Sequence, residues 1–252
     1  MTARSALLLA ALVAACGNAP ARASIYEVPE TDGEVVGARD VNILADDVHF
    51  ETAAVIGMIR LRLAIQGTQT CTLWVFDALN RPPLHAVAFT NVPATNQFDV
   101  STYDFPMHLQ VPRDVYVGFS AQGGGWTNTL VDYWSWGTHV VRGIAGTAGQ
   151  YYYGPVAGGQ LTTGYDAGNG SYGCMQILAE PARIDGAEMA TGHVHLAISG
   201  LPIYATNAVE RVESAGETNW AEVETLPLGA SNHIWAATNG PATSVFYRIR
   251  SR

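Results

Sequence analysis

The stretch IGMIRLRLAI at residues 56–65 decides the fold, because apolar and polar side chains alternate along it. Ile59 and Leu61 fall on one face of an extended chain, and Arg60 and Arg62 fall on the other. A repeat of two residues is typical of a β-strand that buries one of its faces. The stretch therefore predicts a half-buried strand.

Similar short runs, bounded by Gly, Pro, Asn or Asp, occur on both sides of this strand. The other predicted strands are residues 41–50, 70–76, 84–90, 98–100, 108–111, 115–120, 130–136, 151–153 and 173–178, followed by 193–199, 208–214, 220–226, 233–237 and 245–250. Turn residues that recur about every 8–12 residues between short strands favour a β-sandwich. The sequence therefore predicts an all-β fold.

A change in composition marks the predicted boundary between two domains. Residues 180–191, EPARIDGAEMAT, are polar or small and contain no run rich in strand-forming residues. We therefore expect a jelly-roll-like antiparallel β-sandwich at residues 24–180, a linker at 181–191, and a small β-sandwich at 192–252.

The overall composition excludes several classes of protein. Hydrophobic residues make up 48% of the 252 residues and charged residues 14%, which rules out a disordered chain or a coiled coil. The net charge of −9 argues against a protein that binds the phosphate backbone of nucleic acid. All 13 basic residues are arginine, so enzymes that need a Schiff-base or P-loop lysine are excluded.

The first 23 residues, MTARSALLLAALVAACGNAPARA, have the pattern of an export signal. Arg4 supplies a positive charge, and residues 6–15 form an unbroken apolar run. This run is too short to span a bilayer stably, but it suits the apolar core of a signal peptide. Residues 21–23, Ala-Arg-Ala, are an A-x-A cleavage site. We expect a secreted or cell-surface protein without a transmembrane span.

A second interpretation of the same segment changes how the protein is held. Residues 13–16, VAAC, resemble a bacterial lipobox, in which Cys16 carries the lipid and becomes the mature N-terminus. Cleavage after Ala23 gives a freely secreted chain, whereas lipidation of Cys16 gives a membrane-anchored one.

Two cysteines, Cys71 and Cys174, remain after cleavage at Ala23, and each lies in a strand-like run. Because an exported chain meets oxidising conditions, an even pair suggests a disulfide. The alternative is a pair of buried thiols.

The C-terminal segment resembles the short fibronectin type III-like module found at the end of many exported bacterial proteins. The likeness is carried by Glu210-Arg211, Trp220 and the strand FYRIR at residues 246–250. It covers about a quarter of the chain, and it departs from the usual pattern in having Val212-Glu213 before Ser214. The resemblance implies a small β-sandwich and brings no catalytic residue with it.

The N-terminal body is similar, more loosely, to exported jelly-roll or "choice-of-anchor" β-sandwich domains. The likeness is carried by ADDVHF at residues 45–50, by the strands at 56–65 and 70–76, and by VYVGF at 115–119. The resemblance implies a surface or extracellular β protein.

An aromatic stretch, GGGWTNTLVDYWSWG at residues 123–137, is the candidate ligand site. On a strand, Asp132, Trp134 and Trp136 share one face, and flat indole rings beside a carboxylate can stack on sugars. Trp126, next to three glycines, is the tryptophan expected to be most exposed. Residues 151–153, Tyr-Tyr-Tyr, offer a second platform. The alternative is that these rings fill the core, as large aromatic side chains usually do.

Three groups of residues are candidate metal sites, and no cofactor is expected. The oxygen-rich groups Asp40, Asn42, Asp46 and Asp47, and Asp166, Asn169 and Ser171, are compatible with a structural calcium ion or with solvated turns. His193 and His195 would point to one side of a strand, which is compatible with a metal pair or with a partly exposed strand face.

Three functions follow from these features. The first is a non-catalytic β protein of the cell surface or extracellular space, with a role in adhesion, matrix or envelope structure. The second is a carbohydrate-binding module that binds a polysaccharide on the Trp/Tyr platform. The third is a secreted polysaccharide hydrolase, which would need a close pair of carboxylates in a cleft. No G-x-S-x-G motif or other catalytic signature is present.

Overall fold

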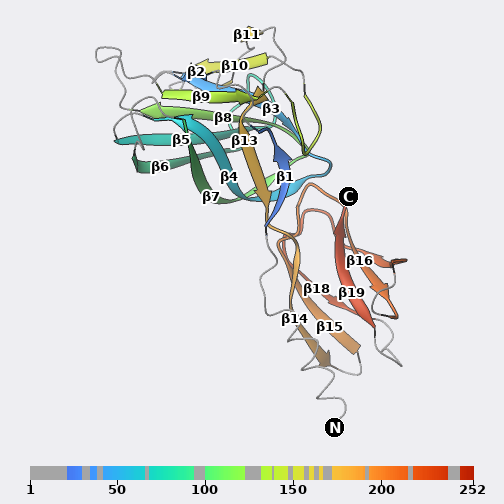
Figure 1. Ribbon diagram of the computed structural model, residues 1–252. Helices are drawn as coiled ribbons and strands as arrows, with labels where there is room; N and C mark the ends of the chain where they lie inside the picture. The colour runs from blue at the N-terminus through green and yellow to red at the C-terminus, as the bar shows by residue number, and fades with distance from the viewer. Residues whose placement is uncertain are drawn as a thin grey trace. The chain divides into compact units, whose positions relative to one another are not determined.

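A computed structural model describes residues 22–29, 35–38, 42–65, 68–93, 100–122, 132–137, 139–146, 150–155, 159–161, 165–166, 172–190, 193–214, 218–237 and 245–252 (Figure 1). Within these ranges the regular secondary structure consists of β-strands alone. The all-β class predicted from the sequence is therefore confirmed. No helix in these ranges is long and apolar enough to cross a membrane.

The chain forms two compact units, which we describe separately. The sandwich unit consists of residues 24–51 and 56–179, and the C-terminal unit consists mainly of residues 180–252. Each unit has its own pair of β-sheets and its own cluster of buried apolar side chains.

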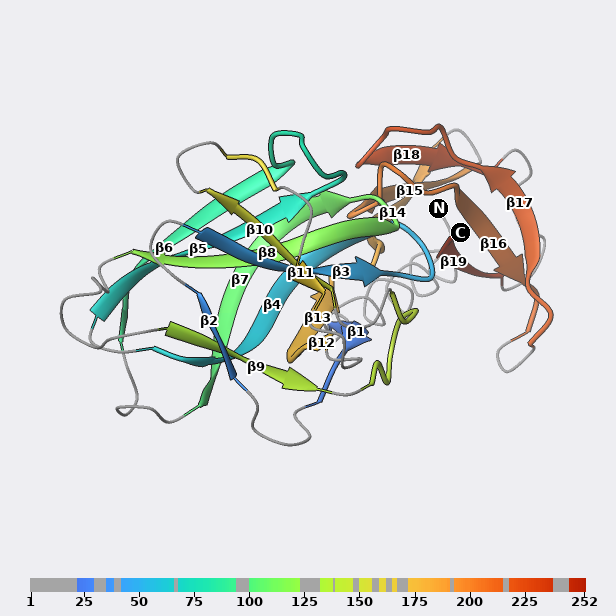
Figure 2. The same ribbon diagram turned by 90° about the horizontal axis from the view of Figure 1, so that it is seen from above.

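The sandwich unit contains a seven-stranded and a six-stranded sheet. The seven-stranded sheet has the order β1-β13-β4-β9-β12, with β2 also paired to β9 and β7 to β4. Its strands are β1 (Ala23–Glu27), β2 (Val35–Ala38), β4 (Ala54–Ala64), β7 (Ser101–Val111), β9 (Asp132–Gly137), β12 (Tyr172–Gly173) and β13 (Met175–Ala179). The six-stranded sheet has the order β11-β10-β3-β8-β5-β6. Its strands are β3 (Asn42–His49), β5 (Thr68–Phe76), β6 (His85–Pro93), β8 (Asp114–Gln122), β10 (Gln150–Pro155) and β11 (Tyr165–Asp166), and Figure 2 shows β3, β8, β5 and β6 side by side.

Strand β4 confirms the alternation that the sequence predicted. Ile59, Leu61 and Leu63 are fully buried, whereas Arg60 and Arg62 between them are only half-buried. The strand therefore buries one face in the core and keeps a charged face, as a repeat of two residues requires.

Strand β3 lies inside the six-stranded sheet, and residues 43–48 are buried throughout. Gly118 of β8 pairs with Ala45 in this sheet. A Cβ atom at Gly118 would lie only 2.7 Å from Cγ2 of Ile43, so glycine is required for β8 to pack against β3. The close packing places two acidic residues of β3, Asp46 and Asp47, inside the protein.

The C-terminal unit is built from two three-stranded antiparallel sheets, with the orders β14-β15-β18 and β17-β16-β19. The strands are β14 (Arg183–Ala190), β15 (His193–Ser199), β16 (Asn207–Val212), β17 (Ala221–Thr225), β18 (His233–Ala236) and β19 (Phe246–Ser251). Its core gathers side chains from both sheets: Val194, Leu196, Ile198, Leu201, Val209, Leu226, Trp235 and Ala237.

The structure differs from the sequence prediction in several strands. The linker predicted at residues 181–191 is wrong for residues 183–190, which form β14 and pair with β15. Ile184 and Ala187 of β14 pack against the core of the C-terminal unit, whereas Arg183 and Glu188 are exposed. This mixture of small and polar side chains hid the strand. Strands β1, β2 and β11 were not predicted either, and only residues 108–111 of β7 were predicted as a strand.

Candidate functional site

The predicted aromatic platform lies largely outside the described part of the chain. Asp132, Trp134 and Trp136 belong by their backbone to β9, which pairs with β2, β4 and β12, but their side chains lie outside the described residues. Trp126 lies outside them altogether, as do the side chains of residues 151–153 on β10. The choice between a ligand platform and a core therefore stays a prediction.

The sandwich unit contains a buried acidic cluster, although the sequence predicted a calcium site or solvated turns at these residues. Asp46 is 1% exposed and Asp47 is 4% exposed. Both carboxyl oxygens of Asp46 accept backbone hydrogen bonds: the N–H of Gly173 on β12 donates to Oδ2 at 2.8 Å, and the N–H of Asp47 donates to Oδ1 at 3.0 Å. Because β12 belongs to the other sheet, Asp46 joins the two sheets of the sandwich.

Burial raises the pKa of Asp46 well above its usual value. The bond from Gly173 opposes this shift, and the neighbouring Asp47 adds to it, because two carboxylates side by side cannot both ionise cheaply. The environment therefore favours the protonated form of Asp46.

Two tyrosines complete the buried side of this cluster. Tyr26 of β1 is fully buried, and within the described residues its hydroxyl has no hydrogen-bond partner. Burial raises the pKa of Tyr26 above its usual value, and the nearby charges of Asp46 and Asp47 raise it further. The pKa of Tyr172 on β12 is raised by the same causes in the same order. Both hydroxyls therefore keep their protons.

A histidine links the cluster to the surface. Nε2 of His49 lies 3.2 Å from Oδ2 of Asp47, and Nδ1 of His49 lies 2.9 Å from Oδ1 of Asp114 on β8. Burial lowers the pKa of His49, but the hydrogen bonds to Asp114 and Asp47 outweigh it and raise the pKa overall. Since both ring nitrogens face a carboxylate, the charged imidazolium, which donates from both nitrogens, fits this geometry best.

Gly146 closes the site over Asp47. A Cβ atom at position 146 would lie 2.3 Å from Oδ2 of Asp47, so only glycine can pack there. Together with the burial of Asp46 and Asp47, this close contact keeps both carboxylates away from a dissolved substrate. The pair therefore does not meet the requirement of the hydrolase hypothesis, which needs carboxylates in an open cleft.

The predicted metal sites gain no support from this geometry. No group of three His, Cys, Asp or Glu side chains in the described ranges is arranged to hold a metal ion. Asp40, Asn169 and Ser171 lie outside the described residues, as do the side chains of Asn42 and Asp166. In the C-terminal unit, Nδ1 of His193 lies 2.8 Å from the carbonyl oxygen of Ala237, and the side chains of His193 and His195 are half-buried.

The two cysteines of the predicted disulfide are both buried in the sandwich unit. Cys71 lies on β5 of the six-stranded sheet, whereas Cys174 lies between β12 and β13 of the seven-stranded sheet. The structure contains no bond between their sulfur atoms. The disulfide therefore stays a prediction. Cys16 lies outside the described residues.

The C-terminal unit has a charged cluster on the β17-β16-β19 sheet. Glu210 of β16 is 2% exposed and accepts hydrogen bonds from Nε of Arg248 at 2.7 Å and Nη1 of Arg250 at 3.2 Å. Burial alone would raise the pKa of Glu210, but the two arginines on β19 outweigh it and lower the pKa. The guanidinium carbon of Arg248 lies 4.4 Å from the ring centroid of Trp220, within range of a cation–π contact. The ion pairs of Glu210 with the two arginines therefore hold β19 against β16.

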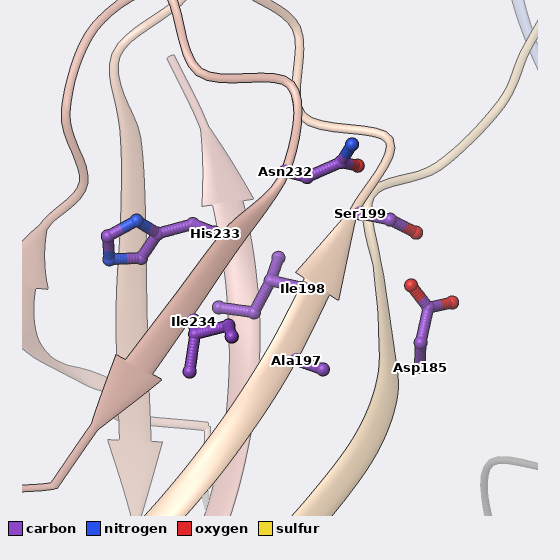
Figure 3. A pocket seen from close by; sticks show the side chains of 7 residues that line it. All are labelled: Asp185, Ala197, Ile198, Ser199, Asn232, His233 and Ile234. Atoms are coloured by element: carbon purple, nitrogen blue, oxygen red, sulfur yellow. The ribbon is translucent and has the colours of Figure 1, made fainter.

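A shallow groove of about 450 Å³ lies on the other sheet of this unit (Figure 3). Its lining side chains come from the three strands β14, β15 and β18 and the turn before β18: Asp185, Ala197, Ile198, Ser199, Asn232, His233 and Ile234. Ile234 is 72% exposed, and it pairs with Ala197 across the two strands. The groove therefore presents a mixed polar and apolar surface.

Sequence reasoning found Asp46 and Asp47 but missed their partners. His49 could have been added, because it lies two residues after Asp47 on the same strand and therefore on the same face. Asp114 and Tyr172 come from strands far along the chain, so no local spacing pointed to them. No protein-family model matches the chain, and no curated protein matches it significantly.

Proposed function

We propose that this chain is a non-catalytic secreted or cell-surface β protein with a structural role in adhesion, matrix or envelope. One observation carries the proposal: the carboxylates with lowered pKa in the described ranges are each bonded to a cationic group on another strand. These bonds are Arg60–Asp104 between β4 and β7 (2.6 Å), His49–Asp114 between β3 and β8 (2.9 Å), and Arg248–Glu210 between β19 and β16 (2.7 Å). Ion pairs that perturb pKa values while bracing a scaffold serve stability rather than chemistry.

The N-terminal signal supports the extracellular part of the proposal. A positive residue, an apolar run and an A-x-A site in this order direct a chain to export. The C-terminal unit is proposed to be fibronectin type III-like. The resemblance of residues 210–250 supports this, together with two facing three-stranded sheets that share one core.

Fractionation of bacterial cells that express the full chain tests this proposal. We expect the chain in the envelope or the medium, because the apolar run at residues 6–15 engages the export machinery. Leu8→Arg places a charge inside that run and should hold the chain in the cytoplasm. Thr2→Arg, which adds the same charge ahead of the run, is the matched control and should be exported. A wild-type chain that stays in the cytoplasm would contradict the proposal.

We propose carbohydrate binding as a second candidate function, with Trp126, Asp132, Trp134 and Trp136 as the binding residues and a polysaccharide as the ligand. The backbone of β9 supports it, because Trp134 and Trp136 are two positions apart on one strand.

A polysaccharide array probed with the chain tests the second candidate. If the rings stack on sugar, the double variant Trp134→Ala/Trp136→Ala should weaken binding by about tenfold or more, since each lost ring contact is worth roughly 0.5–1.5 kcal/mol. Trp220→Ala, which removes a half-buried ring of the C-terminal unit, is the control and should bind like wild type. Absence of binding to every polysaccharide would remove this candidate.

A further inference from the structure

The β17-β16-β19 sheet of the C-terminal unit has two open edges. Within the described residues, β17 and β19 each pair with β16 alone. An unpaired edge strand presents a row of backbone N–H and C=O groups that can accept another strand.

The hydrogen bonds of β19 show which residues face the open edge. The N–H of Arg252 donates to the carbonyl oxygen of Thr206 at 2.9 Å, and the N–H of Thr206 donates back to Arg252 at 3.1 Å. In an antiparallel ladder, such mutually bonded pairs alternate with pairs that point their backbone groups away. Tyr247, Ile249 and Ser251 therefore direct their N–H and C=O groups to the open edge.

The same alternation applies to β17. The N–H of Leu226 donates to the carbonyl oxygen of Asn207 at 2.7 Å, so the residue before it, Thr225, points its backbone groups outward. The side chains of all five residues of β17 are exposed. The strand is therefore accessible along its full length in the described part of the unit.

The two edges carry opposite charge. Strand β19 and the residue after it contain Arg248, Arg250 and Arg252, whereas β17 contains Glu222 and Glu224 and no basic residue. Glu210 on the central strand pairs with Arg248 and Arg250, and Glu222 pairs with Arg252 of the same copy. The two glutamates offset two of the three arginine charges, which leaves one net positive charge along β19.

This charge pattern distinguishes between modes of self-pairing. If β19 of one copy paired with β19 of another, arginines would face arginines. If β17 paired with β17, glutamates would face glutamates. Both arrangements are unfavourable because like charges repel. Pairing of β17 with β19 of another copy brings opposite charges together. The other sheet offers no such complement, since β14 carries a bulge near Gly186 and β18 has only four residues, without Asp, Glu or Arg.

We propose that the C-terminal unit self-associates head to tail, with β17 of one copy pairing along β19 of a second copy. Both strands run antiparallel to β16, so a copy displaced along the sheet meets its neighbour with the two strands parallel. A pair of copies still has one open β17 edge and one open β19 edge, so this contact does not close and chains of copies can grow. The inference goes beyond the proposed function and does not depend on where the protein is located.

Sedimentation velocity of the purified full chain over a range of concentrations is the test. The wild type should form larger species as its concentration rises, and added salt should weaken the association about two- to fivefold per screened ion pair. Thr225→Pro blocks the β17 edge by removing an outward N–H, and Ser251→Pro blocks the β19 edge in the same way. Each variant alone should stay monomeric. Thr225→Ala and Ser251→Ala keep the N–H and should associate like wild type.

Mixing the two proline variants gives the sharpest result. Each has one blocked and one open edge, so an equal mixture should form dimers and nothing larger. A proline variant that dimerises alone would show pairing between identical edges and overturn the proposal, as would a wild type that is monomeric at every concentration. Hydrogen exchange of the wild type gives a measurement that is independent of the variants. The amides of Thr225 and Ile249 should gain protection as concentration rises, and unchanged exchange would overturn the proposal.

Discussion

Replacement of Trp235 by alanine is expected to lower the free energy of unfolding of the C-terminal unit by about 3–5 kcal/mol. Trp235 of β18 is 2% exposed, and its ring centroid lies 5.2 Å from that of Tyr247. Its Nε1 donates a hydrogen bond to Oε2 of Glu224 at 3.0 Å. The variant therefore leaves a large cavity and a carboxylate that has lost its donor. A unit of this size has a small margin of stability, so we expect it to unfold while the sandwich unit stays folded.

Unfolding in guanidinium chloride, followed by near-ultraviolet circular dichroism, measures this effect. Ile234→Ala is the matched control, because Ile234 is the next residue on β18 but faces solvent. This control should change the free energy of unfolding by no more than about 0.5 kcal/mol. Equal losses of stability in the two variants would contradict the assignment of the two faces of β18.

Replacement of Asp46 by asparagine is expected to change how stability depends on pH. The pKa of Asp46 is raised in the folded state, so the folded chain keeps this proton at pH values at which the unfolded chain has lost it. Above the unfolded pKa of about 3.9, folding therefore takes up a proton. The wild type should therefore lose about 1.4 kcal/mol of stability per pH unit from there up to the folded pKa. Asparagine cannot ionise, so the variant should lose this slope.

The free energy of unfolding of the same variant should be lower than that of the wild type at acid pH and should approach it as pH rises. Both carboxyl oxygens of Asp46 accept hydrogen bonds from backbone N–H groups. Asparagine has only one side-chain oxygen, so its NH₂ group would face one of these N–H donors. At acid pH the variant should therefore be less stable by roughly 1–3 kcal/mol. As pH rises the wild type loses stability, so the difference in free energy of unfolding between wild type and variant becomes smaller.

The slope is best measured between about pH 5 and 6 by chemical unfolding. His49 also has a raised pKa, so its contribution to stability is present below the unfolded pKa of about 6.5 and is lost as pH rises through its folded pKa. Asp104 has a lowered pKa, and its contribution is complete above about pH 5. Asp104→Asn is therefore the control and should keep the wild-type slope in this window. An unchanged slope in Asp46→Asn would refute the assignment.

The sequence predicted the strands whose side chains alternate strongly or form a continuous apolar run. Residues 56–65 form most of β4, and the runs at 70–76 and 115–120 form the central parts of β5 and β8. Strand β14 was missed because Ala187 and Gly186 carry little apolar surface, and its place is fixed by backbone pairing with β15. An edge strand of such small and polar residues leaves almost no periodic signal.

The candidate site was harder to predict than the fold. Local spacing brought Asp46 and Asp47 together, but it suggested a calcium site or solvated turns, whereas the six-stranded sheet buries both side chains. Asp114 enters the site through the pairing of β3 with β8, and Gly173 through the packing of one sheet on the other. Neither relation can be read from neighbouring positions in a sequence.

The intact mass of the chain recovered from the envelope or medium in the fractionation experiment tests export most directly. The account predicts a mass that corresponds to loss of residues 1–23, so that the chain begins at Ser24. A mass that starts at Cys16 and carries lipid would keep the surface location and change the means of attachment. A chain that retains Met1 to Ala23 and lies in the cytoplasm would contradict the proposal of a secreted or cell-surface structural protein.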